Sequence, residues 1–146
     1  MAPPKHVHVK VFIEDPDVDP PKFHFTSDDL RVGPNNELTF KNNGHAGFTI
    51  SFDLQQPSHG FQFPGNEMAR QAVWSKFGER ECPKSPASEV FTEPRVSQDK
   101  LSLRVHNRNS ESDTGMFGYT LRVTNDGGSN HLPLDPGGVN QNGPSN

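Results

Sequence analysis

The feature that most constrains the fold is an alternation of apolar and polar residues with a period of two. Residues 6–13 read His-Val-His-Val-Lys-Val-Phe-Ile, so three valines share one side of an extended chain and two histidines and a lysine share the other. Alternation recurs at residues 48–54 and 117–123, where aromatic and aliphatic residues hold every second position. Because side chains alternate across a strand but not along a helix, the chain is predicted to be all-β.

Segments rich in Pro, Gly and Asn separate the alternating ones and predict turns. Further extended segments are predicted within residues 23–32, 37–41 and 101–105, which gives about seven or eight strands. Residues 66–78 fit either a short helix or an edge strand through Val73 and Trp74. Residues 79–94 hold several prolines and are predicted to be a long ordered loop.

Length and composition favour a single domain. The chain has 146 residues, of which 29% are apolar, with 13 Gly, 14 Pro and 11 Phe. Such a balance suits a narrow core between two sheets, filled by large rings. We therefore predict a single-domain antiparallel Greek-key β-sandwich with at most one short helix. It would span residues 1–126, and a Gly/Pro/Asn-rich C-terminal tail, residues 127–146, would be partly docked on it.

Charge and apolar patterning argue against several classes of protein. The net charge is −4 and the sequence shows no run of basic residues, so nucleic-acid binding is not expected. No apolar run approaches the ~20 residues of a membrane span, so no membrane partner is expected. No apolar targeting segment is seen at the N-terminus, so a cytoplasmic location is expected, or a periplasmic one if a signal peptide was removed. The single Cys82 cannot form an internal disulfide and is expected to be a buried structural thiol.

The order of these features resembles the N-terminal half of the cupredoxins, the pseudoazurin-like proteins in particular. The shared features are an alternating first strand, a Phe-containing second strand, a turn near Gly33, a strand ending at Phe40, and an Asn/Gly turn that delivers His45. The segment Gly115–Gly118 is similar to the family's Gly-x-aromatic approach to its copper loop. The resemblance implies a cupredoxin-like Greek key, in which His45 would match the first copper ligand.

The chain departs from that family where the copper loop should be. The resemblance would place the Cys ligand near Leu121, and no thiol is there. His131 stands alone, Met116 precedes the expected position, and Cys82 lies in an earlier loop. A type-1 centre needs its His, Cys and Met ligands at one end of the sandwich. We therefore expect the scaffold without a redox copper site.

A second, looser resemblance is to small bacterial β-sandwich proteins of uncharacterised function. It depends on Cys82-Pro83 and on the closing segments 134–136 and 140–142. This resemblance implies no activity.

Histidines supply the candidate metal ligands: His6, His8, His24 and His45. His6 and His8 share one face of the first strand, and His24 could join them if the second strand pairs alongside. Imidazole suits zinc, nickel or copper(II), whereas the simpler interpretation is a solvated strand face and no cofactor at all. We favour the simpler interpretation.

Phe61, Phe63 and Trp74 are the candidate partner-binding residues. They form either a cluster packed under a long loop, which we favour, or an exposed aromatic patch for a sugar or protein. The sequence has no Gly-x-Ser-x-Gly and no His-Glu-x-x-His, so no enzyme is expected. The leading hypothesis is a non-catalytic binding or assembly module that engages a protein partner or a second copy of the chain. The alternative is a metal-binding protein.

Overall fold

A computed structural model of the chain describes residues 5–15, 17, 22–33, 36–42, 47–57, 59–77, 87–107, 115–124, 132–134 and 137–142. The described elements, in chain order, are β1 (Lys5–Asp15), β2 (Lys22–Thr26), β3 (Arg31–Val32), β4 (Leu38–Asn42), β5 (Phe48–Leu54), the 3₁₀ helix η2 (Asn66–Gln71), β6 (Val73–Phe77), β7 (Phe91–Val96), β8 (Ser102–Asn107), β9 (Gly115–Val123), β10 (Leu132–Leu134) and β11 (Gly137–Asn142). The predicted all-β class with at most one short helix is confirmed for the described part of the chain.

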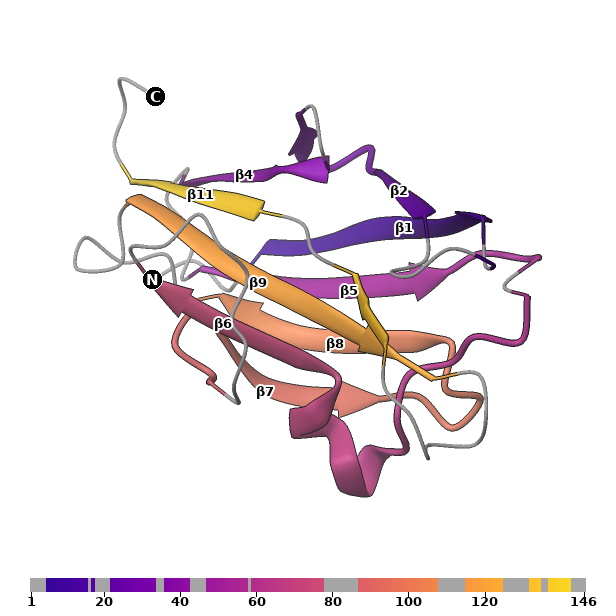
Figure 1. Cartoon of the computed structure of the whole chain (residues 1–146). Coiled ribbons are helices and arrows are strands. Elements are labelled where there is room, and N and C mark those ends of the chain that lie inside the picture. Colours follow the sequence, from indigo (N-terminus) through magenta and orange to yellow (C-terminus); the bar gives the residue numbers. More distant parts are fainter. Residues whose placement is uncertain are drawn as a thin grey trace.

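The strands form two sheets that lie one over the other (Figure 1). One is five-stranded, in the order β2-β1-β5-β8-β7. The other is six-stranded, in the order β10-β9-β11-β4-β3, with β6 paired to β9. Most strand pairs are antiparallel, whereas β1 pairs with β5 and β4 pairs with β11 in parallel. Between β1 and β5 the chain crosses to the six-stranded sheet through β3 and β4, and it returns in the direction of β1.

The core lies between the two sheets and is built by the alternating positions. Every second residue of β1 from Val7 to Ile13 is buried, as are Phe48, Ile50 and Phe52 of β5. From the other sheet come Phe117, Tyr119, Leu121 and Val123 of β9. Phe91 of β7 joins the two sets, since its ring centroid lies 6.0 Å from that of Phe52 and 4.8 Å from that of Tyr119. The burial of these rings is the main source of stability.

Three segments differ from the expectation or refine it. Residues 91–96 form β7, although the sequence predicts a loop that reaches residue 94. Residues 66–77 hold both predicted alternatives in succession, because η2 ends at Gln71 and β6 begins at Val73. Beyond residue 126, β10 pairs with β9, and β11 lies between β9 and β4. Among the described residues, no helix combines the length and apolar character needed to cross a membrane.

Candidate functional site

The outer face of the five-stranded sheet gathers the polar side chains that alternate with the core. Core positions 48, 50, 52 and 54 of β5 leave Thr49, Ser51 and Asp53 on the outer side. Thr49 of β5 lies between His6 of β1 and His106 of β8. Ser51 of β5 lies between His8 of β1 and Arg104 of β8. Side chains from β1, β5 and β8 therefore lie in rows across one surface, which we call the outer face.

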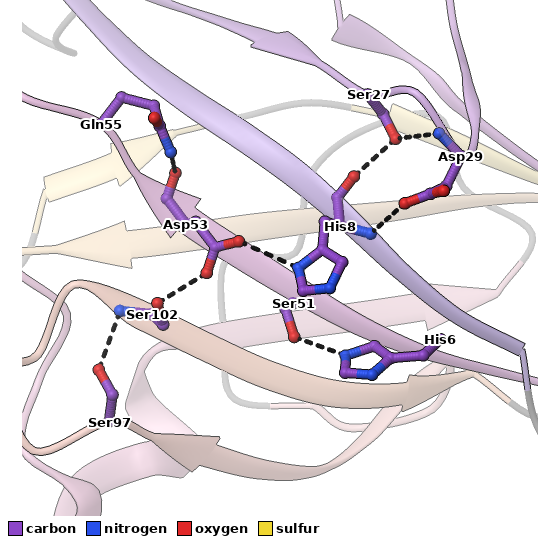
Figure 2. Close-up of polar contacts among 9 residues, drawn as sticks. All are labelled: His6, His8, Ser27, Asp29, Ser51, Asp53, Gln55, Ser97 and Ser102. Carbon is purple, nitrogen blue, oxygen red and sulfur yellow. Dashed lines mark hydrogen bonds and ion pairs between the residues drawn. The ribbon is translucent and has the colours of Figure 1, made fainter.

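Asp53 is the centre of a chain of polar contacts on this face (Figure 2). One carboxylate oxygen accepts a 2.6 Å hydrogen bond from Ser102 Oγ, and the other lies 3.3 Å from His8 Nδ1. The backbone N–H of Ser102 in turn donates to Ser97 Oγ at 3.1 Å. The contact with Asp53 orients the exposed His8 ring toward β5.

His6 lies one row from His8 on the outer face and also contacts β5. Its Nε2 is hydrogen-bonded to Ser51 Oγ at 2.9 Å, and its ring stacks on that of His8 with centroids 4.7 Å apart (Figure 2). The side chain of His8 is 57% exposed, whereas Ser51 is buried. Each imidazole thus has one nitrogen engaged by β5, and its other nitrogen makes no hydrogen bond with a described residue.

The backbone of His8 is held by the bend that follows β2. β2 ends at Thr26, opposite Lys10, so it does not extend to His8. Instead Asp29 accepts a 2.9 Å hydrogen bond from the N–H of His8, and Ser27 Oγ donates to its carbonyl at 2.6 Å. These side chains satisfy backbone groups that would otherwise lie open on β1, and they fix the position of His8.

The other predicted metal ligands lie elsewhere. β2 does pair with β1, but His24 lies opposite Phe12, four residues beyond His8, which is about 13 Å along a strand. The His24 ring stacks on Phe12 at 4.6 Å, and its Nδ1 contacts the Glu14 carboxylate. Since the register separates these rings, His24 does not join His6 and His8. His45 lies outside the described residues, as do Cys82 and His131.

Metal-ligand geometry is limited on the outer face. No group of three or more His, Cys, Asp or Glu side chains within the described residues is placed to hold a metal ion. His6 and His8 could supply two imidazole nitrogens, with the carboxylate of Asp53 behind His8. Further ligands would have to come from water or from a bound molecule.

Positive charge gathers on the same face. Lys10, Arg95 and Arg104 are exposed, and none of them makes an ion pair with another described residue. Arg95 of β7 lies directly opposite Arg104 of β8. The sequence shows no run of basic residues because these three positions are far apart along the chain. Arg95 and Arg104 meet through strand pairing, whereas Lys10 lies on β1, opposite Asp53 of β5.

The predicted aromatic patch is divided between the core and the opposite surface. Phe61 and Phe63 are completely buried, so they offer no surface to a partner and correspond to the core-packing alternative. Trp74 lies on β6, and its ring is covered by the Arg122 guanidinium carbon 3.9 Å from the ring centroid. Arg122 also donates to Gln71 Oε1 at 3.0 Å, and its burial lowers its pKa. The indole face that could meet a ligand is thus occupied by Arg122.

Sequence reasoning did not identify Ser51, Asp53 and Ser102 as one network, nor Arg95 and Arg104 as one pair. The alternation of β5 and β8 assigns most of these residues to the outer side of their strands. Which strands become neighbours depends on long-range pairing, and a period-two pattern carries no information on that.

Comparison with models of known protein families and with curated proteins finds no match. The functional argument therefore depends on the geometry of the outer face.

Proposed function

We propose that this protein is a non-catalytic binding module and that its ligand surface is the outer face of the five-stranded sheet. The observation that carries the proposal is the set of exposed, unpaired cations, Lys10, Arg95 and Arg104, beside a fixed histidine network. Guanidinium groups bind anionic groups through paired N–H donors, and the strands fix where the backbone of each residue lies.

The geometry supports binding over catalysis. His6 and Ser51 lie at a distance suitable for a base and a nucleophile, but Asp53 contacts His8 and not His6. Ser51 lies in a central strand with a neighbour on each side, so the backbone amides around it serve the sheet. Those amides are not free to stabilise an oxyanion, as acyl transfer would require.

Charge reversal at one arginine tests the proposal. The experiment immobilises the wild-type protein and the variants Arg104→Glu and Arg31→Glu. It then compares which partner molecules each immobilised protein retains. Arg31 lies on β3 of the other sheet, so its variant carries the same charge change away from the outer face. We expect wild type and Arg31→Glu to retain a common partner that Arg104→Glu loses. Equal retention by all three proteins would contradict the proposal.

Self-association is the second form of the binding hypothesis, and it requires a different surface. Two copies meeting through their outer faces would gather two sets of Lys10, Arg95 and Arg104 in one interface, and this concentration of positive charge is unfavourable. We therefore place any homo-oligomer contact at a sheet edge or in the C-terminal region. Sedimentation analysis at high protein concentration tests this version, and a monomer there would count against it.

Metal binding at His6 and His8 is the alternative function, and the His8–Asp53–Ser102 chain favours it. A carboxylate behind an imidazole fixes the ring and raises its basicity as a ligand. Calorimetric titration of untagged protein with copper(II) or zinc should show binding that His8→Ala abolishes and His24→Ala leaves intact. If His24→Ala weakens the binding as much as His8→Ala, the metal is not held by this pair.

A further inference from the structure

The pairing of β7 with β8 contains an irregularity that decides which way Arg95 points. Thr92 lies opposite His106, so regular antiparallel pairing would bring Pro94 opposite Arg104 and Arg95 opposite the buried Leu103. The observed register shifts by one residue, and Arg95 lies opposite Arg104. The extra residue thus turns Arg95 from the core side to the outer face. Bulges that redirect one side chain are common beside binding sites.

The backbone at this bulge is in an unfavourable conformation. Glu93 has a φ of 52°, in the left-handed region that residues other than glycine seldom adopt. Such conformations persist only where the surrounding structure enforces them, and they concentrate at functional positions. A bulge with a proline also protects the exposed edge of a sheet. Edge protection explains Pro94, but it does not explain why the redirected residue is a second arginine.

Neither arginine of the resulting pair makes an ion pair with another described residue. Directly opposed side chains in an antiparallel pair have Cβ atoms about 5 Å apart, and like charges at that spacing are destabilising. Asp53, one row away, is engaged by His8 and Ser102. Glu93 is exposed at the bulge and makes no ion pair with either arginine.

The neighbours of the pair are groups that bind oxyanions. Ser51 lies opposite Arg104 on its other side, where it is hydrogen-bonded to His6. His106 lies two residues further along β8, opposite Thr92. Guanidinium groups bind phosphate through paired N–H donors, and two of them at one point neutralise its charge.

From this arrangement we propose that Arg95 and Arg104 bind a phosphate group, with His106 beside them. The inference rests on the proposed function, because it names the ligand chemistry of the outer face. The bulge and the strained Glu93 serve to bring the second guanidinium to the site. A bound phosphate offsets the repulsion that the unliganded pair carries.

The test measures the thermal midpoint and calorimetric binding of inorganic phosphate in a low-salt buffer, with sodium chloride at equal ionic strength as reference and inorganic sulfate as a second oxyanion. We expect phosphate to raise the midpoint of wild type above the chloride reference. Arg95→Gln and Arg104→Gln should each weaken binding at least about tenfold, as expected for losing hydrogen bonds to a charged group. Arg31→Gln, on the other sheet, should bind as wild type does. A stronger response to sulfate than to phosphate would overturn the assignment of phosphate.

A second measurement separates lost binding from misfolding. Without phosphate, Arg95→Gln and Arg104→Gln should melt at or above the wild-type temperature, because each substitution removes a like-charge contact. Equal responses of wild type to phosphate and chloride, or unchanged phosphate binding by Arg95→Gln, would overturn the inference. The remaining outcome is that the wild-type protein does not bind phosphate but Arg104→Glu still loses the partner that the wild type retains. The proposed binding module then stands, and only the proposed ligand chemistry is wrong.

Discussion

Replacing Phe91 by alanine tests the packing of the two sheets at the residue that joins them. Phe91 is completely buried, and its ring centroid lies 6.0 Å from Phe40 and Phe52, 5.4 Å from Phe117 and 4.8 Å from Tyr119. Burying a Phe side chain contributes about 3–5 kcal/mol when measured by truncation to alanine. The free energy of unfolding of a single domain is about 5–15 kcal/mol, so Phe91→Ala should lose a large share of the total stability.

Urea unfolding followed by the fluorescence of the single tryptophan, Trp74, measures this loss. Phe12→Ala is the matched control, because Phe12 is only half-buried on the outer face of β1 and should cost about 1 kcal/mol. Phe91→Leu keeps most of the apolar volume and should cost about 1.5 kcal/mol. A loss for Phe91→Ala no larger than that for Phe12→Ala would show that the two sheets do not meet at this ring.

Three further substitutions have expected outcomes. Arg122→Gln should cost about 0.5–2 kcal/mol in urea unfolding and shift Trp74 emission to longer wavelength, because it uncovers the indole; unchanged emission would contradict the contact. Asn36→Ala should cost about 2 kcal/mol by the same assay, since the Asn36 amide accepts from the N–H of Phe25 and its φ is 63°; a neutral result would show that the amide does not hold β2. Hydrogen bonds from Ser97 Oγ and the Leu101 N–H lower the pKa of Asp99, so its stabilising contribution is present above its unfolded pKa of about 3.9 and is lost as the pH falls through the lower folded value. Asp99→Asn should therefore be less stable than wild type at neutral pH, and the unfolding free energies of the two proteins should converge as the pH falls. A difference in unfolding free energy that does not change with pH would refute this cause.

Much of the fold could be predicted because the buried face of a strand repeats every second residue. Residues 6–13, 48–54 and 117–123 become β1, β5 and β9 with the predicted positions facing the core. The parallel pairing of β1 with β5 could not be predicted in the same way. Each strand reads identically whichever neighbour it takes, and the choice depends on contacts between residues distant in sequence. Which pair of strands runs in parallel within the mainly antiparallel sandwich could not be predicted for that reason.

The candidate site could be predicted only in part. The alternation identifies His6 and His8 as outward residues, and the structure places them together on the outer face. It also identifies Asp53 and Ser102 as outward, but their contacts with His8 follow from the order β1-β5-β8. His24 shows the limit of such reasoning. β2 does pair with β1, but the register sets His24 opposite Phe12 and away from the rings of His6 and His8.

The irregular strand at residues 91–96 explains both why β7 was hard to predict and how Arg95 reaches the proposed site. Phe91 and Val96 both face the core, and their odd separation of five positions breaks the period of two, so the segment does not read as a strand. The cause is the extra residue at Glu93 and Pro94, which also turns Arg95 toward Arg104. The same extra residue therefore interrupts the alternating pattern of β7 and creates the arginine pair. The Asn66 side chain accepts a 2.9 Å hydrogen bond from the N–H of Val96 and so supports the backbone after the bulge, but neither Arg95 nor Arg104 makes an ion pair with another described residue. The proposed phosphate would supply the interaction that the two like charges lack.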